Sequence, residues 1–171
     1  KVFSYADCAI IPEPSELQLA DIAYSTALNH KLLTSEQPKV AFLSFSTNSS
    51  ADHYRVKKVK KAIEIFSNKY PAILHENCEL QFDAAINCGI AEKKYSKSIL
   101  RGDANVLIYP NLDAGNIAYK ITERIGMYDA IGPLLQGLKF SIHDLSRGCK
   151  VDDIVDISII AAYQGMLNAN L

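Results

Sequence analysis

Short apolar segments alternate with segments of helical periodicity along this chain, and the alternation restricts the folds open to it. Apolar, β-forming residues predict buried strands over residues 2–8, 40–45 and 105–109. Apolar residues at helical spacing predict helices over residues 16–31, 56–66, 115–125 and 151–167. Such alternation is typical of an α/β domain with a mostly parallel sheet.

Other segments give weaker signals. Residues 80–82 are a short strand candidate, residues 83–95 are a possible helix, and residues 131–138 and 140–143 favour no single structure. Ser15 and Gln18 form a capping-box pattern, which predicts where the first helix begins.

The composition is that of a globular protein. Hydrophobic residues make up 49% of the 171 residues, enough for one domain with a core. The formal net charge is −1, so no general attraction to nucleic acid or to an anionic membrane is expected. No apolar run is long enough to cross a bilayer, and the first residues show no signal-peptide pattern.

The cysteines argue against a metal centre and a disulfide framework. They are Cys8, Cys78, Cys88 and Cys149, and none belongs to a CxxC pair. Their wide spacing makes a zinc site improbable, and no metal is expected. We expect reduced thiols and a cytoplasmic location.

Three polar loops, residues 44–52, 111–116 and 143–153, occupy positions where open α/β sheets bind ligands. In the first loop, the hydroxyls of Ser44, Ser46 and Thr47 and nearby backbone N–H groups could bind an anion. An ordinary hydroxyl-rich loop is the alternative. The segment lacks the glycines and the Gly-Lys-Ser/Thr ending of a P-loop, so a triphosphate site is not supported.

A basic run follows that loop and has two interpretations. It consists of Arg55, Lys57, Lys58, Lys60 and Lys61. The apolar stripe of residues 56, 59, 63 and 66 favours the solvated side of an amphipathic helix. The alternative is a contact with ligand phosphates.

The third loop combines a hydroxyl, a guanidinium and carboxylates just before an apolar helix. Arg147 could bind phosphate through two hydrogen bonds, and Ser146 could donate to a developing oxyanion. A solvated surface turn explains the same residues. Asp152 and Asp153 fit the first turn of the helix, where the helix dipole stabilises carboxylates but makes them weaker bases.

Taken together and in order, several segments resemble phosphate acetyltransferases, or phosphotransacetylases. They are residues 5–9 (YADCA), 41–47 (AFLSFST), 79–85 (ELQFDAA), 109–120 (YPNLDAGNIAYK), 131–138 (IGPLLQGL) and 144–149 (DLSRGC). The resemblance implies a three-layer domain whose mostly parallel sheet is flanked by helices, in an architecture similar to isocitrate and isopropylmalate dehydrogenases.

The resemblance also implies a reaction and a set of site residues. The reaction interconverts acetyl-CoA and phosphate with acetyl phosphate and CoA, by direct transfer in a ternary complex. Asp153 would take the proton of the CoA thiol, Arg147 would hold the phosphate, and Ser146 would stabilise the acyl centre. The residues implied in CoA or substrate binding are Ser44, Ser46, Thr47, Asn116 and Arg147. No cofactor or metal is implied, because CoA is a substrate, and the partner is a second copy in a homodimer.

Two related families are alternatives. Phosphate butyryltransferases share the architecture, but the sequences of residues 131–138 and 144–149 are closer to those of the acetyl enzymes. The C-terminal domain of large malic enzymes senses acetyl-CoA and tends to lose the Ser-Arg pair and its Asp. The presence of Ser146, Arg147 and Asp153 therefore favours an enzyme over a regulatory module.

The resemblance covers only part of the family's enzyme. Residues 1–135 match its second α/β domain, and residues 136–171 match a returning segment that packs on a first domain absent from this chain. We therefore expect a partial enzyme that is inactive on its own. A module that only binds CoA or mediates association remains the other possibility.

Overall fold

The computed structural model describes the backbone of residues 1–168 and the side chains of residues 1–166. The chain forms two compact units, Lys1–Ala118 and Tyr119–Leu171. The boundary falls inside helix α5 (Leu112–Arg124). The division expected at residue 135 refers to the domains of a longer protein and stays a prediction.

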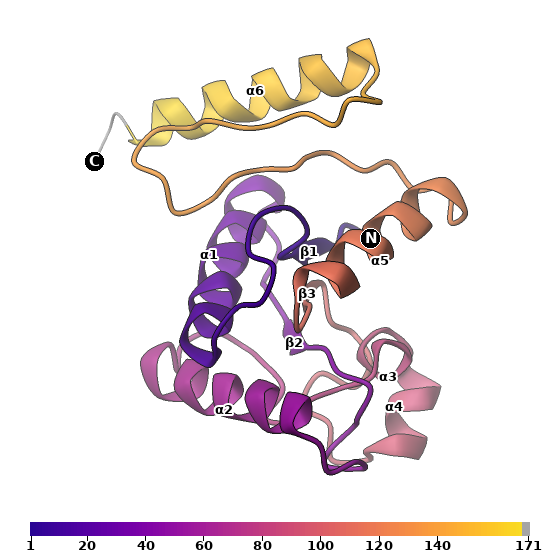
Figure 1. The fold of residues 1–171 in the computed structure, drawn as a ribbon. Coiled ribbons are helices and arrows are strands. Elements are labelled where there is room, and N and C mark those ends of the chain that lie inside the picture. The colour runs from indigo at the N-terminus through magenta and orange to yellow at the C-terminus, as the bar shows by residue number, and fades with distance from the viewer. Residues whose placement is uncertain (169–171) are drawn as a thin grey trace. The chain divides into compact units, whose positions relative to one another are not determined.

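A three-stranded parallel sheet is the centre of the first unit (Figure 1). Its strands β1 (Ser4–Ala6), β2 (Val40–Phe42) and β3 (Val106–Ile108) lie in the order β1-β3-β2. The α/β class and the parallel sheet are thereby confirmed. Each strand is shorter than the apolar segment that predicted it, and beyond β2 the pairing continues only as a bridge between Leu43 and Leu80.

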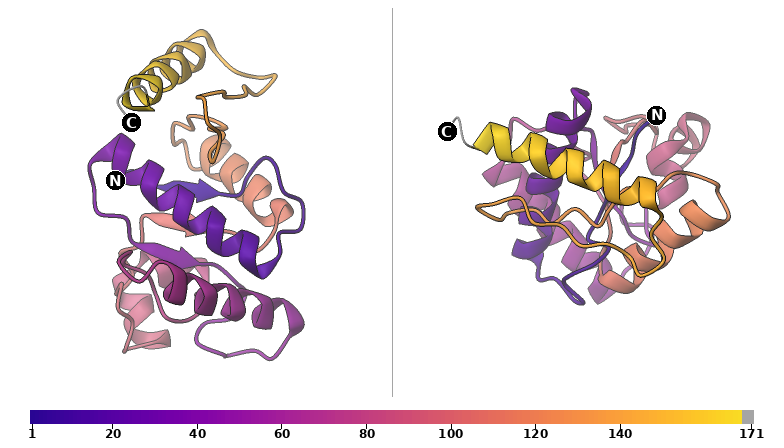
Figure 2. Two further views of the ribbon diagram at one scale, coloured as in Figure 1. Left: turned by 90° about the vertical axis from the view of Figure 1, so that its left-hand side faces the viewer. Right: turned by 90° about the horizontal axis from the view of Figure 1, so that it is seen from above.

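Successive strand residues face opposite sides of the sheet and build a core on each. The helices α1 (Glu16–Thr34) and α2 (Tyr54–Lys69) cover the first core, which includes Val40, Phe42 and Ile108. The second core contains Ala41, Leu43, Leu80, Ala85, Leu100, Leu107 and Tyr109. Figure 2 shows the two helix layers on the two faces of the sheet, which is the expected three-layer arrangement.

Local sequence explains where the two long helices begin. Ser15 and Gln18 form the capping box that the sequence predicts, with both reciprocal hydrogen bonds present. The ring nitrogen of His53 caps α2 by accepting a hydrogen bond from the backbone N–H of Arg55 at 3.2 Å. The apolar stripe of α2 is buried, and Arg55, Lys57, Lys60 and Lys61 are exposed on its other side.

The helix predicted over residues 83–95 is interrupted. It forms α3 (Phe82–Ile86) and α4 (Cys88–Lys94), separated by the extended residue Asn87. The segment that contains Gly102 packs closely on this break, since a Cβ atom on Gly102 would lie 2.3 Å from the backbone of Asn87. The strand candidate at residues 80–82 is only a bridge, because Gln81 already caps α3.

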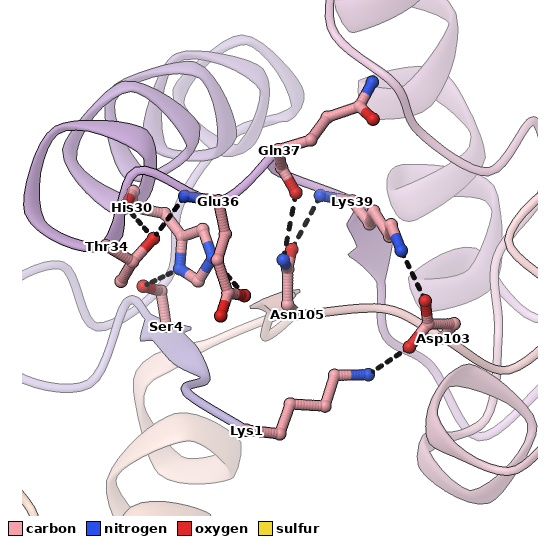
Figure 3. A network of polar contacts seen from close by, with 9 residues as sticks. All are labelled: Lys1, Ser4, His30, Thr34, Glu36, Gln37, Lys39, Asp103 and Asn105. Atoms are coloured by element: carbon pink, nitrogen blue, oxygen red, sulfur yellow. Dashed lines mark hydrogen bonds and ion pairs between the residues drawn. The ribbon is translucent and has the colours of Figure 1, made fainter.

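Polar contacts close the amino edge of the sheet (Figure 3). The Asn105 side chain accepts from Lys39 N at 2.7 Å and donates to Gln37 O at 3.0 Å. His30 is 1% exposed, and its Nδ1 lies 2.9 Å from Ser4 Oγ. Burial lowers the pKa of His30, although Glu36 at 3.8 Å opposes the shift.

The second unit contains the end of α5, a segment without regular structure and helix α6 (Val151–Asn168). The segment covers residues 126–150, including the two stretches that favoured no single structure in the sequence. His143 joins it to α6, since its Nδ1 accepts from Leu135 N at 3.2 Å and its Nε2 lies 2.9 Å from Gln164 Oε1. Among the described residues, no helix is long and apolar enough to span a membrane.

Candidate active site

The loops that follow the three parallel strands lie at one edge of the sheet, where ligands of open α/β sheets bind. After β1, the Asp7 carboxylate accepts the backbone N–H groups of Ala9, Ile10 and Ile11 at 2.7, 3.1 and 2.7 Å. The Asn116 amide of α5 donates to Cys8 O at 3.0 Å. The predicted ligand-binding residue Asn116 is therefore at this edge and helps to hold the loop after β1.

The loop after β2 carries the other predicted binding residues of the first unit. Ser46 and Thr47 are 0% and 4% exposed, and Ser44 is half-buried. Ser46 Oγ donates to Glu79 Oε1 at 2.7 Å, and Thr47 Oγ1 accepts from Gln81 N at 3.0 Å. Ser44 Oγ accepts from Ser46 N at 3.3 Å. The three hydroxyls thus bind to the protein itself and fix the shape of the loop.

Glu79 is the anchor of this loop and was missed in the sequence. Its side chain is 0% exposed, and Oε1 also accepts from Ser49 N at 2.6 Å. Asn48 and Ser49 have φ values of 47° and 66°, a left-handed conformation that costs free energy in residues other than glycine. The only sequence signal for this role is an acidic residue between the apolar Cys78 and Leu80.

The backbone N–H groups of residues 46–51 are all used inside the protein. Each N–H group of residues 46–51 donates a hydrogen bond to a loop oxygen or to Glu79. These six N–H groups are therefore not available to an anion, and the exposed side chains of the loop are the candidates for contact with a ligand.

Phe45 of this loop and three residues at the start of α2, His53, Tyr54 and Arg55, form an exposed cluster that we call the aromatic platform. The ring centroids of Phe45 and His53 are 5.6 Å apart, and those of His53 and Tyr54 are 4.4 Å apart. Arg55 Nε donates to the Tyr54 hydroxyl at 3.1 Å, which raises the pKa of the guanidinium. Phe45 and Tyr54 are 56% and 67% exposed.

The second unit carries Ser146, Arg147 and Asp153 at the start of α6. Ser146 lies in a turn closed by Cys149 N, which donates to Ser146 O at 3.0 Å. Asp153 is half-buried in the first turn of α6, and its Oδ2 accepts from Lys150 N at 2.7 Å. The local chain therefore fixes the Asp153 carboxylate at the helix start.

Arg147 provides the exposed cation of this turn. Within residues 1–166, no hydrogen bond or ion pair holds its guanidinium, and the Ser146 side chain beside it is also exposed. A guanidinium with free donors can bind a phosphate through two hydrogen bonds. The structure thus groups the predicted site residues in two sets, one in each unit.

The described residues offer little for metal or thiol chemistry. They contain no cluster of three His, Cys, Asp or Glu side chains that could hold a metal ion. Burial raises the pKa of Cys78 to about 12, so its thiol stays protonated near neutral pH and is a poor nucleophile.

Residues 1–162 match the family model described as "Phosphate acetyl/butaryl transferase". A phosphate acetyltransferase of Borreliella burgdorferi is 48% identical over 159 residues, covering 93% of this chain and 45% of the relative. A phosphotransacetylase structure from Streptococcus pyogenes is 45% identical with a TM-score of 0.89, covering 94% of this chain and 48% of that chain. For EutD phosphotransacetylase from Staphylococcus aureus, the values are 46% identity, TM-score 0.87, and 94% and 49% coverage.

The chain thus spans about half the length of the relatives that it matches. The match is high in identity, covers nearly all of this chain and agrees with the three-layer fold described above. This chain belongs to the phosphate acetyl/butyryl transferase family.

Proposed function

We propose that this chain is part of a phosphate acetyltransferase, which moves an acetyl group between the sulfur of CoA and an oxygen of phosphate. The observation that carries the proposal is the 48% identity over 159 residues to a protein of that activity. CoA, acetyl phosphate, acetyl-CoA and phosphate are the substrates and products, and the reaction as proposed uses no cofactor.

Asp153 is the proposed base. In the direction that makes acetyl-CoA, it takes the proton of the CoA thiol, because the thiolate is the nucleophile. The sulfur attacks the acetyl carbonyl carbon, a C–S bond forms, and the bond from that carbon to the phosphate oxygen breaks. The backbone N–H of Lys150 holds one Asp153 oxygen, which orients the carboxylate.

Arg147 and Ser146 are the proposed partners of the charges that develop. The exposed guanidinium of Arg147 binds the phosphate, and its charge favours departure of the phosphate from the acyl carbon. The Ser146 hydroxyl donates to the carbonyl oxygen as negative charge develops there. Direct transfer requires both substrates to be bound together, so the proposed mechanism passes through a ternary complex.

The loops at the carboxyl edge of the first unit are the proposed CoA-binding region. Ser44 lies in the loop after β2 and Asn116 in the first half of α5, while Ser46 and Thr47 act by holding the loop after β2 in shape. This chain covers 45% of the length of a matched relative, so we propose that other parts of the enzyme supply further site residues. We therefore expect the isolated 171-residue chain to be inactive.

The alternatives differ in chemistry or in acyl chain. An acetyl-CoA-sensing module binds without turnover, and a phosphate butyryltransferase prefers a longer acyl group. The Ser146, Arg147 and Asp153 set favours an enzyme. We further propose a cytoplasmic homodimer; the four free thiols fit the first of these two properties.

The test is an assay of the intact enzyme with acetyl phosphate and CoA. Acetyl-CoA and phosphate should appear in equal amounts, and butyryl phosphate should react more slowly. Binding of CoA without product would favour the sensing module, and faster reaction of butyryl phosphate would favour the butyryl enzyme. The isolated chain serves as the matched sample that should give no product.

A further inference from the structure

The aromatic platform is exposed, yet the loop that carries Phe45 is tightly built. On one side of Phe45, Ser44 N donates to Leu80 O at 2.9 Å. On the other side, Ser46 is fully buried and bonded to Glu79. The structure thus fixes the backbone around a ring that is itself 56% exposed.

The two other rings are held by the start of α2. His53 caps the helix through its contact with Arg55 N, and the His53 ring lies against Tyr54 with an interplanar angle of 36°. Tyr54 is in turn bound by the Arg55 side chain. Two separate segments therefore bring three rings and a guanidinium together at the surface, with the Phe45 and His53 rings edge to face at 70°.

The surroundings of the platform are basic. Residues 52–61 contain five basic side chains and one acidic one, but Lys57, Lys58 and Lys61 form ion pairs with Asp52, Glu13 and Glu64. Arg55 and Lys60 are the two of these five cations for which no ion pair is found among the described residues, and they favour a ligand with negative charge beside a flat ring. Lys60 Nζ reaches the Ser49 hydroxyl at 2.9 Å, which places a cation on the same loop. Arg55, Lys57, Lys60 and Lys61 are exposed on α2, whereas Lys58 is half-buried and paired with Glu13.

We propose that the aromatic platform is a stacking site for a purine base, namely the adenine of the CoA molecule. The inference rests on the proposed function, which supplies a substrate with an adenine and phosphates. An adenine ring stacks on aromatic faces and on guanidinium planes, and such contacts require no base-specific hydrogen bond. The prearranged rings lose little conformational freedom on binding.

The loop after β2 would then contact CoA through the Phe45 ring and not through its hydroxyl groups, which the sequence had suggested as ligands of an anion. Its polar groups are used inside the protein, and its contribution to CoA is the ring that it displays. An aromatic side chain of a second copy could also cover the platform. If a second copy covered the platform, substitutions of Phe45 and Tyr54 would change the oligomeric state and leave the affinity for CoA unchanged.

The experiment measures CoA binding by calorimetry in the intact enzyme and in variants of the platform. Phe45→Ala and Tyr54→Ala should each weaken CoA binding about tenfold, the size of one lost stacking contact. Tyr54→Phe keeps the ring and should bind CoA nearly as well as the wild type. Leu28→Ala removes a side chain of α1 that is 47% exposed and serves as the matched control.

Three further readouts separate stacking from general damage. Adenosine 3′,5′-bisphosphate should compete with CoA in the wild type and about tenfold less well in Phe45→Ala. The KM for CoA should rise about tenfold in Phe45→Ala and in Tyr54→Ala, in step with the loss of affinity. Melting temperatures identify any variant that fails to fold, in which case the other variant decides.

The possible results are distinguishable. Unchanged CoA affinity in both alanine variants overturns the platform and leaves the proposed function intact. A change of oligomeric state with unchanged affinity also overturns it, in favour of a second copy. A wild-type enzyme that does not bind CoA overturns the proposed function and this inference with it.

Discussion

The carboxylate of Glu79 accepts a hydrogen bond from the hydroxyl of Ser46 at 2.7 Å, and both side chains are completely buried. The same oxygen accepts the N–H of Ser49, one of two adjacent left-handed residues. A buried acceptor of this strength offsets the conformational cost of the turn. The shape of the loop after β2 therefore depends on a residue that follows it by thirty positions in the sequence.

Replacement of Glu79 should destabilise the protein and loosen this loop. Glu79→Ala leaves the Ser46 hydroxyl and the Ser49 N–H buried without their acceptor, with an expected loss of about 2–4 kcal/mol in the free energy of unfolding. Glu79→Gln keeps an acceptor oxygen and should lose less. Urea unfolding measures both losses, and equal stability of the alanine variant and the wild type would contradict the anchoring role.

Gly115 permits close contact between α5 and the loop after β1. A Cβ atom there would lie 2.1 Å from Asp7 O, so Gly115→Ala should cost about 1–3 kcal/mol as the backbone shifts. Gly165 in α6 has no atom within 4 Å of a Cβ position. Gly165→Ala should therefore stabilise the helix by about 0.5–1 kcal/mol. Thermal unfolding of the two variants would contradict this pair of predictions if the signs were equal.

The helix starts and the fold class could be predicted from the sequence because their causes are local. The Ser15–Gln18 capping box and the start of α6 at Val151 are examples. The break at Asn87 has a local part, since the Asn87 side chain caps α4 by accepting from Ile90 N at 3.0 Å, and a non-local part, since Gly102 packs on the Asn87 backbone only in the folded chain. The buried state of Ser46 depends likewise on Glu79, so hydroxyl spacing alone could not show where those hydroxyls point.

His30 should make the stability of the protein depend on pH below about 6.5. Burial lowers its pKa in the folded state from 6.5, so the unfolded chain binds the proton more strongly. The free energy of unfolding should be unaffected by His30 above pH 6.5 and should fall as the pH drops toward the folded-state pKa. The carboxyls of Asp21, Asp83 and Asp103 have pKa values lowered from 3.8, so their effect on stability falls at a lower pH than that of His30.

Urea unfolding at about pH 7.5 and about pH 5.5, in the wild type and in His30→Gln, isolates this contribution. The wild type should lose more stability between the two values than the variant does. An identical loss in both proteins would exclude His30 as the cause.

The most direct test of Asp153 as the base compares two neighbouring acids in the intact enzyme. Asp153→Asn keeps an oxygen that can accept from Lys150 N, so the helix start should survive while the base is lost. The turnover of CoA and acetyl phosphate should fall by about 10²–10⁴-fold. Asp152→Asn, an exposed acid in the same turn, should retain nearly full turnover. Near wild-type kcat in Asp153→Asn, with an unchanged pH profile, would contradict the assignment of Asp153 as the base of the acetyl transfer.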